Sequence, residues 1–368
     1  MLIKISRALL ASAMLACVFA AGTCAQERAA VNRRVAVTFD DLPAPQGELE
    51  DMRGITSRLL ASLRRNGVPV VGFVNEGKLY QRRGETDERI ELLRAWLDAG
   101  AELGNHTFTH INLRRRPLAA YEEDVVRGET VTRMLLEERG MKLRYFRHPF
   151  LWTGETPEYK EGLAKFLDSR GYTVAPVTVD NDDYVFADAY FRAKKRGDAE
   201  TARRVADAYV PYMETVFDFF EKLSGETFGR EVRQVLLLHA NEINADRFDE
   251  LASMMKRRGY AFVTLEEALK DPAYAEPDAL YKSGVSWIHR WRMAKGMPEK
   301  REPRSPKFVD DLYRAGQGNY SGLPLSAGDG RGRQVNTPLG SGGLSGETAP
   351  RYRGGYRPAL PSLKREAL

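Results

Sequence analysis

Residues 35–41, VAVTFDD, decide how this chain of 368 residues folds. The first five, Val35 to Phe39, are small, β-branched or aromatic, which predicts a short buried strand. Asp40 and Asp41 follow directly, and two carboxylates crowded in a partly buried place resist joint ionisation unless a cation lies near them. A helix N-cap or a turn is the alternative interpretation when the pair is considered alone. The stretch therefore predicts a strand with acidic groups at its C-terminal end.

Strand-like and helix-like segments alternate from Arg34 to about Leu269. We expect strands at residues 35–39, 68–74, 101–104, 143–146, 173–179, 234–238 and 260–263. We expect helices at residues 55–63, 90–97, 121–136, 251–258 and 265–269. Repeated β-α units of this kind predict an α/β fold, with a parallel sheet or barrel covered by helices.

One interval, about residues 185–225, breaks this rhythm because its pattern is helical throughout, with many charges and an aromatic cluster. It predicts one or two helices inserted between strands, and we favour packing against the flank of the barrel over a special role. We place the folded domain at residues 26–293, with its core at 34–270. Residues 294–368 form a basic tail rich in Gly and Pro without hydrophobic periodicity, which predicts that the tail is largely disordered.

The positive charge of the chain is concentrated near its C-terminus. The formal net charge is +5, but residues 290–368 alone hold 15 Lys and Arg against 7 Asp and Glu, so the remainder is slightly acidic. A basic tail is only weak support for nucleic-acid binding, and we expect no nucleic-acid partner. Contact between the tail and an anionic polymer of the cell envelope is an alternative role, which salt screening weakens.

The first 25 residues have the pattern of a secretory signal peptide. Lys4 and Arg7 precede an apolar stretch, residues 8–21, that is too short for a comfortable membrane span, and Ala25 ends a run of small residues suited to cleavage. A lipoprotein cleaved at Cys17 and an uncleaved anchor are the alternatives. We expect an exported protein of the periplasm, cell envelope or medium, without a transmembrane segment after cleavage.

Histidines supply the next chemical motif, HTFTH at residues 106–110, which follows the third expected strand. Two imidazoles four residues apart can face one ion, and His is the commonest metal ligand at neutral pH. A pair of surface or core histidines is the alternative, although the chain has only five His. Because both cysteines, Cys17 and Cys24, lie in the signal segment, the mature chain would hold a metal with His and carboxylate groups alone.

Further motifs at expected strand ends are individually weak. RHPF at residues 147–150 contains an Arg that can hold a carboxylate bidentately, but an ordinary turn is the alternative. DNDDY at residues 180–184 offers carboxylates, and a solvated turn is its alternative. LLLH at residues 236–239 ends an apolar strand with a His suited to general acid work, or with a capped core His.

Together the five motifs resemble those of the polysaccharide deacetylase family (NodB-homology domain, carbohydrate esterase family 4). The family elements TFDD, H-[ST]-x-x-H, R-x-P-[FY], D-x-x-D-W and L-x-H correspond in order to TFDD, HTFTH, RHPF, DNDDY and LLH here, across roughly residues 34–270. The resemblance implies a distorted (β/α) barrel. It also implies hydrolysis of acetyl groups from a polysaccharide or oligosaccharide, such as an N-acetyl sugar of chitin, peptidoglycan or exopolysaccharide.

The resemblance further implies one divalent metal ion, with zinc as the first expectation and cobalt or nickel as alternatives. Asp41, His106 and His110 would hold the ion and leave positions open for water and substrate. Asp40 would be the general base that takes a proton from the metal-bound water.

Other motif residues would complete the implied site. His239 would be the general acid, Arg147 would fix the general base, and Asp183 would support Arg147. The backbone N–H of Phe150 would stabilise the oxyanion, and the side chains of Phe150 and Leu237 would line a slot for the acetyl methyl group.

Departures from the family pattern concern the substrate more than the chemistry. Tyr184 stands where the fourth motif usually has Trp, and the gap from Tyr184 to Leu236 is longer than in compact members. Trp152, Tyr184 and Trp287 are candidate aromatic platforms for sugar rings. A glycan-binding relative without turnover is one alternative, and a deacetylase or esterase acting on O-acetylated xylan or a small molecule is another.

Overall fold

The computed structural model describes residues 33–317 except Arg115. The predicted signal peptide, residues 1–25, and the part of the predicted tail beyond Gln317 lie outside the described residues. Among the helices of the described part, none combines the length and the apolar character that crossing a membrane requires.

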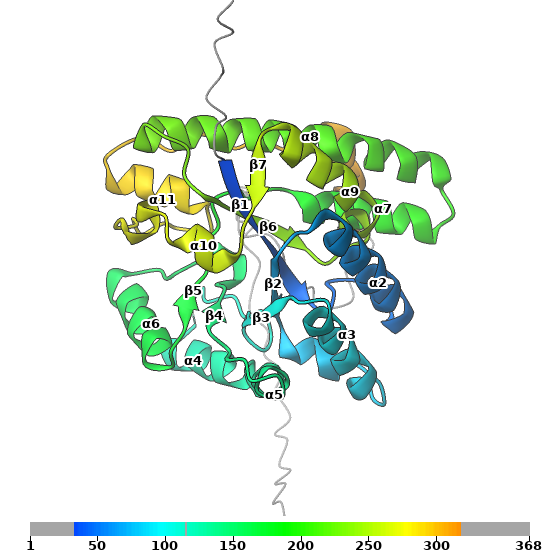
Figure 1. Ribbon diagram of the computed structural model, residues 1–368, viewed down its shortest axis with the longest axis horizontal. Coiled ribbons are helices and arrows are strands. Elements are labelled where there is room, and N and C mark those ends of the chain that lie inside the picture. The colour runs from blue at the N-terminus through cyan, green and yellow to red at the C-terminus, as the bar shows by residue number, and fades with distance from the viewer. Residues whose placement is uncertain (1–32, 115, 318–368) are drawn as a thin grey trace, which may run out of the picture. The chain divides into compact units, whose positions relative to one another are not determined.

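In the part of the chain that the structure describes, seven parallel strands form one sheet (Figure 1). They are β1 (Arg33–Leu42), β2 (Val70–Val74), β3 (Glu102–Asn105), β4 (Tyr145–Phe146), β5 (Thr173–Val174), β6 (Gln234–His239) and β7 (Tyr260–Phe262). Their order is β5-β4-β3-β2-β1-β6, and β7 pairs with the beginning of β1. The sheet thus contains the strands that the alternating pattern predicts, with β4 and β5 shorter than expected.

The segment after β5 closes this sheet on itself. The backbone of residues 173–175 pairs with β4, whereas Thr178 and Val179 each donate a backbone hydrogen bond to the carbonyl of Val235 in β6, at 3.0 Å. Val179 and Leu236 form a further parallel bridge. The strands therefore form a small distorted barrel, which confirms the expected fold class.

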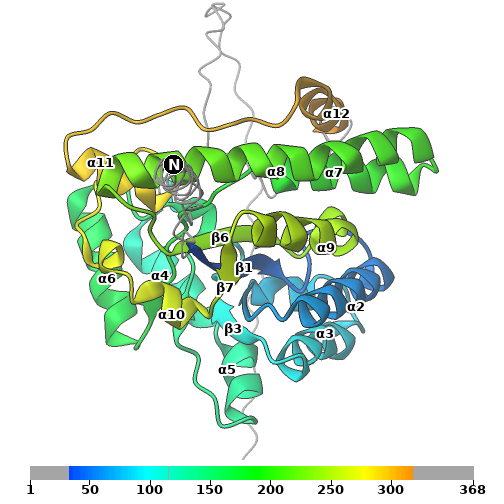
Figure 2. The same cartoon turned by 45° about the horizontal axis from the view of Figure 1, so that its top comes forward.

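Helices cover the outside of the barrel (Figures 1 and 2). The longer ones are α2 (Leu49–Asn66), α3 (Thr86–Asp98), α4 (Leu118–Arg127), α5 (Thr130–Glu137), α6 (Pro157–Ser169), α7 (Asp183–Lys195), α8 (Ala199–Phe228), α9 (Glu242–Arg257), α11 (Trp287–Ala294) and α12 (Lys307–Gln317). Short helical turns are η1 (Glu76–Tyr80), η2 (Pro149–Leu151), α10 (Leu265–Leu269) and η3 (Pro272–Ala275).

The side chains of β1 alternate between two cores, as a strand requires. Val35, Val37 and Phe39 are fully buried under the helices, where the Phe39 ring lies 5.5 Å from the ring of Trp96. The opposite face packs inside the barrel, in a cluster formed by Ala36, Val71, Phe73, Tyr145, Ala175 and Val235 and closed below by Leu265 and Ala268 of α10. Asp40 therefore ends the inward-facing row of β1 at the barrel mouth.

The helix expected at residues 121–136 is two helices, α4 and α5, so that prediction is wrong. Gly128 is the C-cap of α4 and permits a close approach, since a Cβ atom there would meet the backbone of Thr107 at 2.6 Å and of Phe108 at 2.7 Å. Asp124, in the last turn of α4, accepts a hydrogen bond from the backbone N–H of Thr109 at 2.9 Å. The break thus brings the end of α4 against the HTFTH loop and supports it.

The inserted segment forms α7 and α8, which pack on each other and on α9 along one side of the barrel (Figure 2). Buried apolar residues recur along α8 at helical spacing, including Val205, Tyr209, Met213, Val216 and Phe220. Packing against the barrel flank, the interpretation we favoured, agrees with these contacts.

Helix α12 lies beyond residue 293, at which the sequence placed the end of the domain. It packs on α7, and its Val309 is fully buried. Phe308, Val309, Leu312 and Tyr313 recur at the spacing of one helix face. This short amphipathic repeat was concealed by the surrounding Pro, Gly and charged residues.

We expect Gly128→Ala to destabilise the protein by about 1–3 kcal/mol, because an added methyl group overpacks the contact with the Thr107 backbone. Gly225→Ala in α8 is the matched control, since no atom lies within 4 Å of a Cβ built there. Helix propensity alone favours Ala, so the control should gain about 0.5–1 kcal/mol. Urea unfolding followed by circular dichroism measures both variants. Equal stabilisation of the two would contradict the close approach at Gly128.

Candidate active site

One cavity opens at the C-terminal ends of β1, β3 and β6, where parallel barrels carry their functional loops. Eight of the eleven site residues predicted from the sequence line it: Asp40, Asp41, His106, His110, Phe150, Tyr184, Leu237 and His239. Arg147 and Asp183 lie behind this lining and contact it. The predicted acid, base, ligand and slot residues are therefore brought together.

Trp152 is the exception, and its prediction as a substrate-binding residue is corrected by its burial. Its side chain is only 4% exposed and does not line the cavity. The indole Nε1 donates to the carbonyl of Tyr281 at 3.2 Å, and the guanidinium of Arg114 lies 5.0 Å from the ring centroid. Trp287 is likewise buried, so neither indole offers a platform for a sugar ring.

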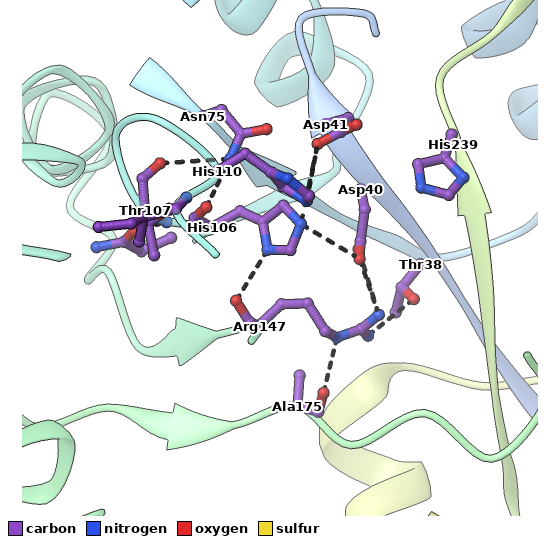
Figure 3. A network of polar contacts seen from close by, with 12 residues as sticks. Thr38, Asp40, Asp41, Asn75, His106, Thr107, His110, Arg147, Ala175 and His239 are labelled. Carbon is purple, nitrogen blue, oxygen red and sulfur yellow. Dashed lines mark hydrogen bonds and ion pairs between the residues drawn. The ribbon is translucent and has the colours of Figure 1, made fainter. Parts of the chain in front are cut away.

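Asp41, His106 and His110 place ligand atoms within 4.8 Å of one another (Figure 3). Asp41 Oδ1 lies 3.9 Å from His106 Nε2 and 3.7 Å from His110 Nε2. This oxygen is buried and accepts no hydrogen bond within the described part of the chain, although the ammonium of Lys78 lies 3.4 Å from it, so a further group can still bind it. Two imidazoles and one carboxylate facing an open cavity fit a divalent ion with exchangeable positions.

The backbone around these groups is held in an unusual shape. Asp41, Thr107 and His110 have positive φ angles of 72°, 64° and 55°, in a region that residues other than Gly enter at a cost. Asn75 supports the loop through its amide, which donates to the carbonyl of His106 at 2.5 Å. The polar supports of the loop thus fix where its two imidazoles point.

His106 is oriented by a bond on the far side of its ring. Its Nδ1 lies 2.8 Å from the carbonyl oxygen of Arg147, so Nδ1 donates and Nε2 keeps its lone pair toward Asp41. Burial, and then the charge of His110, hold the pKa of His106 well below its ordinary value. The ring is therefore neutral at physiological pH, the form that binds a metal.

The guanidinium of Arg147 is fully buried beneath Asp40 (Figure 3). Its Nη1 donates to Asp40 Oδ1 at 3.2 Å, its Nη2 to Thr38 Oγ1 at 3.0 Å and its Nε to the carbonyl of Ala175 at 2.7 Å. Burial raises the pKa of Asp40 to about 6, although the charges of Arg147 and His239 oppose the rise. Asp40 is thus a carboxylate at neutral pH with more than the usual affinity for a proton.

Asp183 supports His239 rather than Arg147, which corrects the role expected from the sequence. Its buried carboxylate accepts from His239 Nδ1 at 2.7 Å, from the backbone N–H of His239 at 2.8 Å and from Asn244 Nδ2 at 2.7 Å. Arg147 lies below the cavity with its donors already engaged, whereas Asp183 begins α7 beside the end of β6. The fourth and fifth motifs therefore form one unit.

The charge of His239 follows from this contact. Burial alone would lower its pKa, but Asp183, together with Asp41 and Asp40, raises it to about 9. His239 is accordingly protonated at neutral pH, while the nearby Asp40 is not. The cavity holds a proton donor and a proton acceptor whose pKa values are displaced in a way that suits acid-base chemistry.

Lys78 was missed by the sequence reasoning. It lies in η1, directly after β2, and its Nζ is 3.0 Å from the carbonyl oxygen and 3.4 Å from Oδ1 of Asp41. Burial raises the pKa of Asp41, but the charge of Lys78 and those of the three nearby imidazoles lower it more, and the net pKa is below the ordinary range. The polar run Asn75-Glu76-Gly77-Lys78 at a strand end was the available signal.

Comparison with known proteins now identifies the domain: residues 27–174 match the family model described as "Polysaccharide deacetylase". Residues 27–174 thus carry the signature of the polysaccharide deacetylase family. The matched stretch contains the first three motifs, with Asp40, the three candidate ligands and Arg147. The fourth and fifth motifs follow it in the sequence, yet the fold brings Asp183 and His239 to the same cavity.

Among its relatives, the peptidoglycan-N-acetylglucosamine deacetylase PgdA of Listeria monocytogenes is 22% identical over 241 residues, which are 65% of this chain and 40% of the relative. The chain thus spans less than half the length of the curated relatives it matches. Two solved structures are similar. One is a family 4 carbohydrate esterase from Streptomyces lividans in complex with acetate (20% identity, TM-score 0.39, 65% of this chain and 96% of that chain). The other is a polysaccharide deacetylase from Bacillus cereus (18% identity, TM-score 0.44, 63% of this chain and 92% of that chain).

We expect Asp183→Asn to lower the pKa of His239 from about 9 to below its ordinary value of 6.5, because burial then acts without its largest electrostatic compensation. The imidazole of the metal-free protein should be protonated at pH 7.5 in the wild type and neutral in the variant. Titration of the ring nitrogens by NMR measures this change. Asp182→Asn is the control, since the carboxylate of Asp182 accepts from the backbone of Ser305 instead. An unchanged His239 titration in Asp183→Asn would refute the assignment.

Proposed function

We propose that this protein is a metal-dependent hydrolase that removes acetyl groups from a polysaccharide or oligosaccharide. The observation that carries the proposal is the convergence of three units on one cavity. These units are the candidate ligands Asp41, His106 and His110, the Arg147–Asp40 pair, and the Asp183–His239 pair. The match of residues 27–174 to the family model supports the reaction class, since that stretch contains the candidate ligands and the Arg147–Asp40 pair.

A divalent ion bound by the two imidazoles and Asp41, with zinc as the first candidate and cobalt or nickel as alternatives, would supply a Lewis acid and lower the pKa of a water molecule. The proton transfer and the positioning are done by side chains of the protein. Asp40, with its pKa raised to about 6, is a carboxylate at neutral pH and can take a proton from the attacking water. Arg147 keeps this carboxylate at the cavity floor through Nη1.

The leaving group requires a proton, and His239 is placed to give one. It carries a positive charge at neutral pH because Asp183 holds Nδ1 by a hydrogen bond, which leaves Nε2 to donate. Asp40 and His239 are neighbouring partners across the β1–β6 pairing. One cavity therefore contains a base on one strand and an acid on the next, as hydrolysis of an amide or ester requires.

Phe150 and Leu237 complete the proposed acetyl-binding slot. Both line the cavity, and the ring of Phe150 lies 4.4 Å from that of His110, centroid to centroid. The backbone N–H of Phe150 is the proposed donor to the oxyanion of the tetrahedral intermediate. Tyr184, also in the lining, is the proposed contact for a sugar ring in place of the family Trp.

We propose an N-acetylated glucosamine polymer of the peptidoglycan type as the substrate, which rests on the names of the curated relatives. Export to the periplasm or cell envelope, as the predicted signal peptide indicates, would place the protein beside such a polymer. A glycan-binding protein without turnover and an esterase for O-acetylated xylan or a small molecule are the competing functions. The intact Asp40 and His239 favour turnover over binding alone.

The deciding experiment measures acetate release by residues 26–368 from N-acetylated chito-oligomers, peptidoglycan and acetylated xylan. We expect release that is abolished by a chelator, restored by Zn²⁺, and reduced at least about 100-fold in both Asp40→Asn and His239→Ala, because each removes a proton-transfer group. Activity that survives in Asp40→Asn would refute the assigned base. Tight glycan binding without acetate would favour the binding function.

Metal binding is tested separately by titration calorimetry on the metal-stripped protein. We expect one Zn²⁺ per chain, and affinity at least about 100-fold weaker in His110→Ala, because the variant loses a direct ligand. His148→Gln is the control, since His148 is also buried but does not line the cavity. Equal losses in the two variants would show that the decrease reflects folding rather than ligation.

A further inference from the structure

The loop after β4 holds two consecutive residues in a left-handed backbone conformation. Phe150 and Leu151 have φ angles of 56° and 53°, and both line the cavity. Neither is Gly, so in this conformation the Cβ atom of each residue crowds its own backbone, which is unfavourable. Such a turn persists only when surrounding groups fix it.

The groups that hold the Phe150–Leu151 turn belong to residues 281–290, which lie outside the five motifs and beyond the residues that match the family model. Arg290 Nη2 donates to the carbonyl of Leu151 at 2.8 Å, and its Nη1 lies 3.2 Å from Thr153 Oγ1. At the other end of the segment, the carbonyl of Tyr281 accepts from Trp152 Nε1. The segment therefore contacts each of the three residues after Phe150.

Gly284 adds a steric contact to these hydrogen bonds. A Cβ atom at this position would lie 1.5 Å from the carbonyl oxygen of Phe150, so only Gly fits there. Gly284 also lines the cavity. Its backbone thus lies directly against the peptide group that follows the proposed oxyanion donor.

The segment is itself anchored to the barrel. The backbone N–H of Trp287 donates to the carbonyl of Val177 at 2.7 Å, and Ser286 Oγ donates to the carbonyl of Thr178 at 2.7 Å. Residues 177–179 are the part of the chain that closes the barrel onto β6. Residues 281–290 therefore connect the barrel wall to the left-handed turn.

Burying the charged side chain of Arg290 at this position is energetically unfavourable. It is fully buried, and no carboxylate of the described residues forms an ion pair with it within 4.0 Å. Its guanidinium instead lies over the ring of Trp287, at 5.0 Å, and donates to uncharged oxygens of the loop and to the carbonyl of Ala279. Burial lowers its pKa to about 10, which still leaves it charged at neutral pH. A buried charge committed to loop oxygens indicates a role in holding the loop.

We infer that Arg290, assisted by Gly284, is a positioning residue that holds the Phe150–Leu151 turn left-handed and thereby aims the Phe150 backbone N–H into the cavity. This inference rests on the proposed function for its effect on catalysis. The conformational effect on the loop stands independently of that function.

Arg290→Met tests the inference, with Arg292→Met as the matched control. Both arginines are buried on α11, but Arg292 contacts Thr227 Oγ1 at 3.1 Å and the carbonyl of Pro298 at 3.3 Å instead of the loop. Hydrogen exchange of the peptide covering residues 147–154 is measured by mass spectrometry. We expect exchange at least about tenfold faster in Arg290→Met and unchanged in Arg292→Met, because only the first frees the loop.

Steady-state kinetics on the acetylated substrate give the second measurement. We expect kcat to fall by about 10- to 100-fold in Arg290→Met with KM and Zn²⁺ affinity within about twofold, because a displaced oxyanion donor weakens transition-state binding alone. Arg290→Lys should recover part of kcat. If Arg290→Met does not fold, Gly284→Ala displaces the same turn and should accelerate the same exchange.

The two measurements separate two kinds of failure. A wild-type protein that releases no acetate refutes the proposed function, while the exchange measurement still decides whether Arg290 fixes the loop. Unchanged exchange in Arg290→Met and Gly284→Ala overturns the inference. Equal acceleration in Arg290→Met and Arg292→Met overturns it as well, because general loosening of α11 would then be the cause.

Discussion

The site depends on the buried guanidinium of Arg147. Its three nitrogens donate hydrogen bonds to Asp40 and Thr38 on β1 and to Ala175 in the closing segment. Its backbone carbonyl accepts a hydrogen bond from the ring of His106. A single residue thus connects the proposed general base, a candidate metal ligand and the barrel wall. Removing one partner of a buried pair of this kind typically costs about 3–5 kcal/mol, because the other charge is left in a medium of low polarity.

Two electrostatic environments lie side by side above this guanidinium. Burial raises the pKa of Asp40 above that of a free carboxylate, although the charges of Arg147 and His239 oppose the rise, whereas Asp183 keeps His239 charged. The difference arises from the partners, since Asp40 on β1 lies against the guanidinium of Arg147, whereas His239 at the end of β6 lies against Asp183 in the first turn of α7. The two environments therefore suit Asp40 to the proposed role of base and His239 to the proposed role of acid.

Much of this arrangement could be predicted from local sequence. Each motif follows an apolar strand, and parallel strands bring their C-terminal ends to one edge, so Asp40, His106 and His239 were expected to meet. What failed depended on contacts distant in sequence. The break at Gly128 lies where the Thr107 backbone approaches closely, and Trp152 donates to the carbonyl of Tyr281, 129 residues later. The partner of Asp183 followed from the position of α7, which no local pattern encodes.

The position of β1 in the sheet has a consequence for how the molecule can form. β1 comes first in the described chain, yet it pairs with β6, and Thr38 donates to the carbonyl of Leu236, 198 residues later. During synthesis β1 can pair with β2 early, but its other edge cannot pair with β6 until nearly two hundred further residues have been made. Residues 27–174, which match the family model, therefore do not bring Asp40 and His239 together by themselves, and the order of translation delays this pairing until the barrel is nearly complete.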